Sequence, residues 1–72
     1  MNETEIEYLK KVGANIKAIR ISKKMKQVEL ARLCNYDRQN MYSIETGKHN
    51  LTLLSLKKIA TALSVKIKDL TI

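Results

Sequence analysis

The sequence has one cysteine, one histidine and no proline, phenylalanine or tryptophan. A single cysteine, Cys34, cannot close a disulfide within the chain, and it points to a reducing, cytoplasmic setting. Cys34 and His49 together supply too few ligands for a structural zinc site, so no bound metal is expected. We expect Cys34 to act as a small buried hydrophobe rather than as a redox sensor, because free cysteines usually do so.

Membrane and catalytic signatures are also missing. No apolar run approaches the roughly 20 residues that span a bilayer, and the N-terminus lacks the basic start and apolar centre of a secretion signal. There is no Ser-His-acid set, no metal cluster and no phosphate-cradling glycine loop, so we expect no enzyme, no cofactor and no small-molecule ligand. Three tyrosines are the only aromatic residues, which argues against a binder of RNA or single strands that stacks bases on aromatic rings.

The chain carries a clear excess of positive charge. It has 14 Lys and Arg against 7 Asp and Glu, a formal net charge of +7. Acidic residues stand at the very start, at Glu3, Glu5 and Glu7, whereas residues 8–28 hold basic side chains and no acidic one. A basic surface attracts polyanions through its long-range field and through counterion release. Charge therefore nominates nucleic acid as the partner, although an ordinary solvated helix face stays open as an alternative.

Helical spacing dominates the apolar pattern. Apolar residues recur three and four positions apart and strand signals are absent, so the predicted fold class is all-α. At this length the chain is expected to form a single domain, residues 1–72, in which almost every apolar side chain serves the core. The expected helices cover about 4–22, 27–34, 38–45, 53–63 and 67–70. Their inward-facing residues are predicted as Ile6, Leu9, Val12, Gly13, Ile16, Ile19, Val28, Leu30, Ala31, Leu33, Cys34, Met41, Ile44, Leu53, Leu56, Ile59, Ala60 and Leu63.

Several residues mark the helix ends. Thr4 opens a capping-box sequence and predicts the start of the first helix. Asp37 and Thr52 are suited to cap the third and fourth helices. Asn35 tolerates the left-handed conformation that a sharp stop between two helices requires, and Gly47 is expected to end the third helix.

Residues 27–45 have the form of a helix-turn-helix. In that unit the first short helix braces the second, which can lie in the major groove of DNA. The first helix is apolar, whereas the second offers hydrogen-bonding side chains wherever it does not pack: Arg38, Gln39, Asn40, Tyr42 and Ser43. Arginine can bond O6 and N7 of guanine, and glutamine or asparagine can bond N6 and N7 of adenine. The pattern indicates double-stranded DNA, with a merely polar helix surface as the alternative.

A family resemblance rests on these residues. The stretch QVELARLCNYDRQNMYSIETG, followed by LTLLSLKKIATALSV, resembles the lambda-repressor and Cro-type helix-turn-helix family, often called XRE-like. The resemblance covers residues 13–70 and depends on Gln27, the pair Leu30-Ala31, Asn35 and the run Ile44-Glu45-Thr46-Gly47 in that order. It implies a compact five-helix lambda-repressor-like DNA-binding domain with its helix-turn-helix at about 27–45.

The resemblance also implies roles for individual residues. Base contacts would fall to Arg38, Gln39 and Ser43, with Tyr42 as a lesser candidate. DNA backbone contacts would fall to Gln27, Lys26, Asn40, Thr46 and Lys48. Gln27 has a second reading, in which it braces the helix that reads the bases. Arg20 and Glu45 correspond to an internal ion pair that joins the first helix to the end of the third in relatives.

We expect a transcriptional regulator that binds a palindromic operator as a homodimer, because one helix reads too few base pairs for discrimination. The dimer interface is predicted at Val65, Leu70, Ile72 and the outer side of the helix over 53–63, because an apolar C-terminal tail has little reason to exist in a monomer. The exposed start of the first helix is the second choice. An antitoxin-type module that binds a protein as well as DNA is the alternative, although the disordered tail that such modules usually carry is not expected here.

Some residues are similar to one subgroup of the family, and others differ from the residues that the family usually has. Asp37-Arg38 and the run 50–52 are similar to controller proteins of restriction-modification systems, but antitoxins, phage repressors and mobile-element regulators share the same pattern. Lys24 and Ser64 replace the usual glycines. Lys26 replaces the usual Ser or Thr cap, so the helix over 27–34 should be capped less well, by around 1 kcal/mol.

Overall fold

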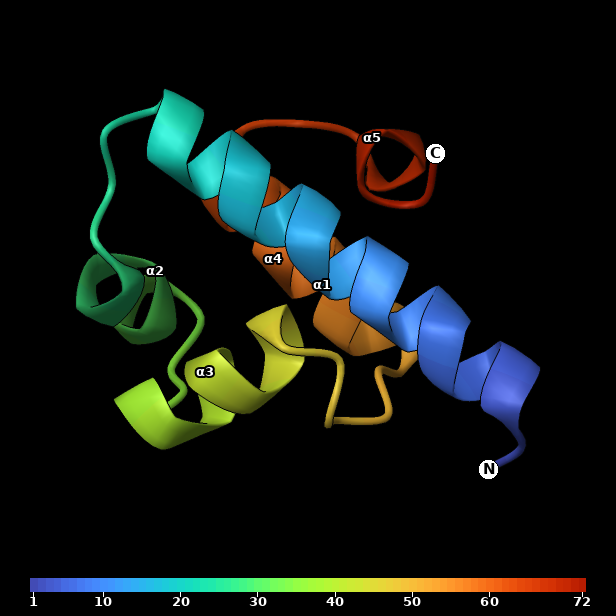
Figure 1. The fold of residues 1–72 in the computed structure, drawn as a ribbon. Helices are drawn as coiled ribbons and strands as arrows, with labels where there is room; N and C mark the ends of the chain where they lie inside the picture. The colour runs from blue at the N-terminus through green and yellow to red at the C-terminus, as the bar shows by residue number, and fades with distance from the viewer.

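Five α-helices make up the protein, and the computed structural model describes all residues 1–72. The helices are α1 (Glu3–Ser22), α2 (Gln27–Leu33), α3 (Arg38–Glu45), α4 (Leu53–Leu63) and α5 (Ile67–Leu70). The chain contains no strand, so the all-α prediction is confirmed. The long helix α1 lies across α4, α2 and α3 lie together on one side of it, and α5 lies on the other side (Figure 1).

The start of α1 corrects one prediction. The N-cap is Asn2 rather than Thr4. The Asn2 side-chain oxygen accepts from the Glu5 backbone N–H, and the Glu5 carboxylate accepts from the Asn2 backbone N–H, both at 2.9 Å. The spacing of a capping box fits Asn2 with Glu5 as well as Thr4 with Glu7, and asparagine is the stronger N-cap.

The core draws on all five helices. Its buried members are Val12, Ile16, Leu30, Ala31, Cys34, Met41, Ile44, Ile59, Ala60, Leu63 and Leu70. Three residues predicted to face inward are instead exposed: Val28 by 50%, Leu33 by 60% and Leu53 by 72%. A helix of seven residues such as α2 presents one narrow stripe to a core. Leu30, Ala31 and Cys34 occupy that stripe, and its neighbours face water.

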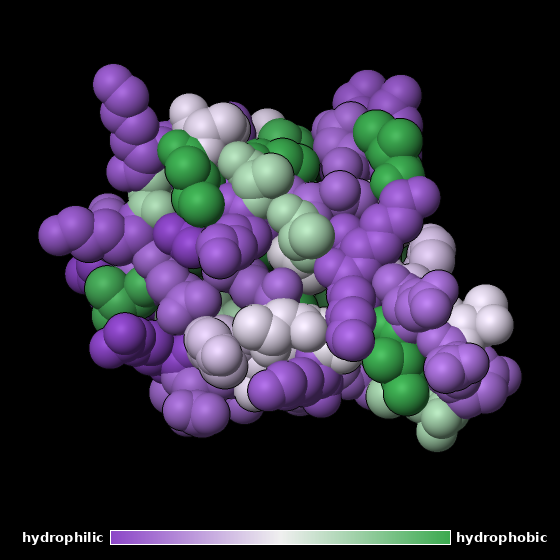
Figure 2. Space-filling view, viewed as in Figure 1, coloured by the Kyte–Doolittle hydropathy of each residue, from purple (hydrophilic) through white to green (hydrophobic).

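The surface is hydrophilic over most of its area, and its exposed apolar side chains are separated from one another on the face that Figure 2 shows. Isolated apolar residues of this kind are ordinary on a protein surface. The consecutive leucines Leu53 and Leu54 differ from this, because two large apolar side chains are exposed next to each other.

Two glycines set how closely α1 approaches the end of α3. A Cβ at Gly13 would contact the carbonyl oxygen of Ile44 and lie 2.7 Å from that of Glu45. Gly47 has φ +76°, and a Cβ there would lie 2.5 Å from the Cα of Lys10. The structure confirms Gly47 as the stop after α3. Both positions therefore hold the two helices at a distance that only glycine permits.

Three residues other than glycine adopt the left-handed conformation: Lys24 at φ 56°, Asn35 at φ 60° and Ser64 at φ 59°. The prediction for Asn35 is confirmed. Asparagine tolerates this conformation because its short polar side chain can bond locally, whereas a lysine gains no such compensation. Lys24 therefore holds local strain in the turn between α1 and α2.

Replacing Lys24 with glycine is expected to raise the free energy of unfolding by about 0.5–1 kcal/mol. The change removes the Cβ that disfavours a positive φ, and part of this gain is offset by the larger entropy that glycine has in the unfolded chain. Urea denaturation measures the change. The matched control is Lys23→Gly, which removes the same charge at φ −95° and should lower the stability. A loss of stability in Lys24→Gly would contradict the strain.

Candidate nucleic-acid interface

The turn between α2 and α3 is fixed by its own hydrogen bonds. The Tyr36 backbone N–H donates to the Ala31 carbonyl at 2.8 Å, which closes the end of α2. The Asp37 carboxylate accepts from the Asn40 backbone N–H at 2.7 Å, which caps α3 as predicted. These bonds, with Asn35 in its left-handed conformation, set the direction in which α3 leaves α2.

The two faces of α3 differ in character. Met41, Ile44 and Glu45 are buried. Arg38, Gln39, Asn40 and Tyr42 are exposed, and Ser43 is half-buried. We call the second group the polar edge of α3. The structure gathers Arg38, Gln39 and Tyr42 with Gln27 around one shallow, open hollow, so three predicted base-contacting residues lie together.

A buried cluster anchors the end of α3, and it contains the predicted ion pair. Arg20 Nε donates to Glu45 Oε2 at 2.7 Å, and Arg20 Nη2 donates to Glu45 Oε1 at 3.1 Å. The two residues are only 8% and 5% exposed. Arg20 Nη1 also donates to the Met25 carbonyl at 2.8 Å. Every buried side-chain polar atom in the protein has a partner, so this charge pair meets the condition under which burial is tolerated.

Gln27 joins the same cluster. Its Nε2 donates to Glu45 Oε1 at 3.0 Å. This bond is the one that the bracing role of Gln27 requires, and the predicted contact of Gln27 with the DNA backbone stays a prediction. Through Arg20 and Gln27, the Glu45 carboxylate ties α3 to both α1 and α2, and the orientation of the polar edge depends on it.

The predicted DNA backbone contacts fall into two groups. Lys26, Asn40 and Lys48 are exposed, and the Lys48 ammonium lies 6.0 Å from the centre of the Tyr42 ring. The hydroxyl of Thr46 instead donates to the Tyr42 carbonyl at 2.8 Å. Lys26 is the N-cap of α2 and makes no side-chain capping bond. Only Glu29 helps there, because its carboxylate accepts from the Lys26 backbone N–H at 2.9 Å.

The predicted dimer residues are corrected in part. Leu70 is fully buried and cannot face a second copy. Asn15 explains this, because its side-chain amide donates to the carbonyls of Leu70 and Ile72 at 3.0 and 3.1 Å and holds the C-terminal segment against α1. Val65 is partly buried against the core. Of the three, only Ile72 is exposed, by 75%.

Sequence reasoning missed the place of Val28. This side chain is half-exposed and lines two surface hollows together with Arg38. The short length of α2 could have indicated that Val28 faces outward, because a helix of seven residues cannot bury two faces. Val28 therefore belongs to the rim of the candidate interface.

The remaining reactive groups are few. Cys34 is a free, fully buried thiol, and burial raises its pKa above the ordinary value, with Lys58 acting in the opposite direction. The buried position agrees with the expectation that Cys34 is a small hydrophobe.

No three acidic, cysteine or histidine side chains are gathered where they could share a metal ion. None of the five helices combines the length and apolar character needed to cross a bilayer.

A short apolar helix joined by a fixed turn to a helix with an outward polar edge, within a five-helix all-α fold, defines the helix-turn-helix class of DNA-binding proteins. The helix-turn-helix family HTH_3 matches residues 16–70, and the chain belongs to that family. The XRE-like resemblance drawn from the sequence is thereby confirmed. Members of this class are DNA-binding transcription regulators.

Two curated relatives match at the level of sequence. The immunity repressor protein of Bacillus phage phi105 is 39% identical over 56 residues, which is 78% of this chain and 39% of the repressor. A Neisseria hypothetical transcription factor from Neisseria meningitidis serogroup B is 37% identical over 51 residues, which is 71% of this chain and 48% of that protein. The chain therefore spans less than half the length of either relative.

Solved structures match over nearly the whole chain. The restriction-modification controller protein C.AhdI from Aeromonas hydrophila has a TM-score of 0.86 and 32% identity, covering 90% of this chain and 94% of its own. A mutant of the restriction-modification controller protein C.Esp1396I has a TM-score of 0.77 and 42% identity, covering 82% of this chain and 75% of its own. The similarity to controller proteins suggested by the sequence thus extends to the fold.

Proposed function

We propose that residues 1–72 form a single DNA-binding domain of a transcriptional regulator that binds a palindromic operator as a homodimer, with α3 in the major groove. Arg38, Gln39, Ser43 and Tyr42 contact bases in this proposal. Five residues contact the DNA backbone in this proposal: Gln27, Lys26, Asn40, Thr46 and Lys48. Gln27 also braces α3 through Glu45. The repressor and controller names of similar proteins support this assignment.

The observation that carries the proposal is the exposed polar edge of α3 on a rigidly held helix. Arg38 and Gln39 carry the two side chains best suited to bidentate bonds with guanine and adenine. Both point away from the core, and the Arg20–Glu45 pair fixes the helix that bears them. Because the helix is already held in place, only the side chains themselves have to be ordered when they bind.

The size of the protein suits a symmetric site. Paired half-sites lie about one helical turn apart, roughly 34–36 Å, for dimers of this class. The longest dimension of the protein is 32 Å, which is close to this spacing and therefore compatible with two adjacent copies on successive major grooves.

Selection from a random pool of duplexes tests the function. The expected result is enrichment of a two-fold symmetric sequence, with binding to it that weakens steeply between two salt concentrations while staying stronger than binding to random duplex. Equal affinity for selected and random duplexes at both salt concentrations would contradict sequence-specific recognition.

Two substitutions separate base contacts from backbone contacts. Arg38→Ala is expected to cost about 1–3 kcal/mol of binding at the selected site and little on random duplex. Lys48→Ala should weaken binding to both duplexes by similar amounts and lower the salt slope. Fluorescence anisotropy with each duplex measures both effects. If the two variants lost affinity in the same pattern, the division between the residues would be wrong.

A further inference from the structure

Val28 is an exposed apolar side chain among polar neighbours. It is the second residue of α2 and is 50% exposed. It is the only apolar residue that lines an open hollow of about 340 Å³, whose other lining residues are Lys26, Gln27 and Arg38. We call this space the Val28 hollow. Val28 therefore forms an apolar wall beside the arginine that is proposed to contact a base.

The backbone on both sides of the Val28 hollow is held in place. Gln27, directly before Val28, donates to the buried Glu45 carboxylate at 3.0 Å. Arg38 directly follows Asp37, whose carboxylate caps α3. A group that enters the hollow therefore meets two walls whose helices need no rearrangement.

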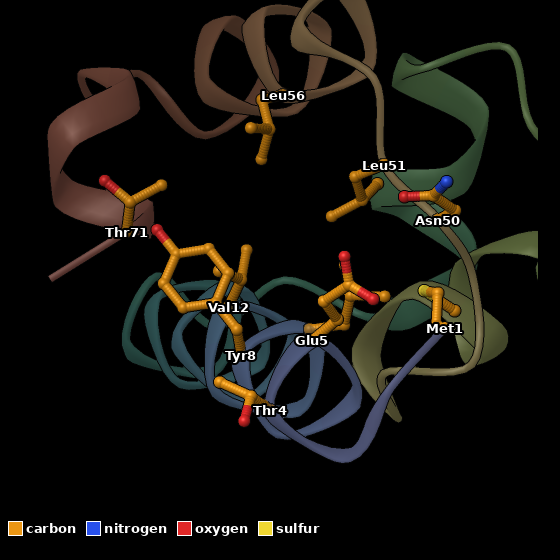
Figure 3. Close-up of a pocket in the computed structure, with 10 residues that line it drawn as sticks. Met1, Thr4, Glu5, Tyr8, Val12, Asn50, Leu51, Leu56 and Thr71 are labelled. Atoms are coloured by element: carbon orange, nitrogen blue, oxygen red, sulfur yellow. The ribbon is translucent and has the colours of Figure 1, made fainter.

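The largest hollow of the protein lies elsewhere. It holds about 480 Å³ between α1 and the start of α4, with Tyr8, Leu51 and Leu56 among its lining side chains (Figure 3). No residue of the polar edge of α3 lines it. The Val28 hollow, in contrast, shares Gln27 and Arg38 with the hollow at the polar edge, so it is continuous with the candidate nucleic-acid interface.

We infer that the Val28 hollow receives the C5 methyl group of a pyrimidine next to the guanine that Arg38 contacts, and this step rests on the proposed function. The C5 methyl of thymine lies in the major groove, where apolar side chains contact it. 5-Methylcytosine carries the same group at the same place. Successive base pairs are stacked about 3.4 Å apart, so a wall beside Arg38 lies beside the next base. Val28 thus adds recognition of a base that Arg38 does not read.

The neighbours of Val28 favour a DNA base over a protein as the occupant. Lys26 and Arg38 line the same hollow and both are basic, so a duplex meets two favourable charges there. A single exposed valine offers far less area than a stable protein contact, which buries about 800 Å² on each partner. One methyl group, however, matches one valine in size.

Replacing thymine with deoxyuridine in the selected duplex tests the methyl site. Deoxyuridine lacks only the C5 methyl and keeps every hydrogen-bonding group of thymine. Each thymine of one half-site is replaced in turn, and fluorescence anisotropy measures the affinity. The wild type is expected to lose about fourfold in affinity at one thymine, beside the guanine at which Arg38→Ala relaxes selectivity, since burying one such group contributes a factor of that order. Val28→Ala should bind the thymine and deoxyuridine duplexes equally at that position.

Leu33→Ala is the matched control. Leu33 is a second exposed apolar residue of α2, by 60%, and it lines none of the hollows. This variant should keep the wild-type preference for thymine. Because Val28 and Leu33 are both exposed, both alanine variants should keep the wild-type circular dichroism.

Duplexes with cytosine or 5-methylcytosine at the same position test the second source of the methyl group. Methylation of the cytosine should raise the affinity of the wild type by a similar factor and leave that of Val28→Ala unchanged. The tighter of the thymine and 5-methylcytosine duplexes identifies the base that the site takes.

The outcomes separate the methyl site from the function. A wild type that is indifferent to the methyl group on both bases overturns the methyl site, and its selective binding of duplex would leave the proposed function standing. A Val28→Ala variant that keeps the full preference for the methyl group also overturns the site, because Val28 would then only support Arg38. Equal binding of the wild type to selected and random duplex would remove the function and the methyl site together.

Discussion

Replacing Glu45 with alanine is expected to lower the free energy of unfolding by about 3–5 kcal/mol, because the change leaves the buried Arg20 guanidinium without its counter-charge. Arg20 is 8% exposed, so water cannot easily replace the carboxylate. Gln27 would lose its partner as well. Since stabilities of small domains are only a few kcal/mol above this loss, urea denaturation should find the variant largely unfolded at low denaturant.

Control variants distinguish the loss of the Arg20–Glu45 ion pair from the loss of any single charge. Glu7→Ala removes an exposed carboxylate from α1 and should change the stability by no more than about 0.5 kcal/mol. In the double variant Arg20→Met/Glu45→Ala neither charge is left alone, so its loss should be clearly smaller than the sum of the two single losses. Additive losses would mean that Arg20 and Glu45 do not act together.

The second large effect is expected at Gly13, where alanine should lower the free energy of unfolding by about 1–2 kcal/mol. The added Cβ would meet the carbonyl oxygens of Ile44 and Glu45, which are backbone atoms and cannot turn aside. Overpacking of this kind costs about 1–3 kcal/mol, and the better helix propensity of alanine recovers only part of it.

Thermal and urea denaturation of Gly13→Ala measure this effect. The control Lys17→Ala changes an exposed position of the same helix and should stay near the wild-type stability. Because the clash moves α1 away from the end of α3, the folded fraction of Gly13→Ala should also bind the selected duplex more weakly than wild type. A variant as stable as the wild type would contradict the close approach of the two helices.

The helix-turn-helix could be predicted from the sequence because its signals are local. Asp37 caps α3 and Asn35 adopts the left-handed conformation, as their chemistry requires. The Arg20–Glu45 pair joins residues 25 positions apart, and only the family resemblance pointed to it. Spacing alone carries no such information, because the pair forms through tertiary packing.

The surfaces were harder to predict than the helices. Three apolar residues lie near the helical spacing of the core residues but are exposed: Val28, Leu33 and Leu53. Only the packed structure shows that the core has no room for them. Leu70 was misplaced for the opposite reason. The bonds from Asn15 to the chain end draw Leu70 inward, and no periodic pattern reveals a contact between residues so far apart in sequence.

The most direct test of the account is a titration of the isotope-labelled protein with its selected duplex, followed residue by residue by nuclear magnetic resonance. We expect the largest changes at the amides and side chains of Arg38, Gln39 and Ser43, with small changes along α5. If the signals of residues 38–43 stayed in place while another surface responded to the DNA, α3 would not be the helix that reads the duplex.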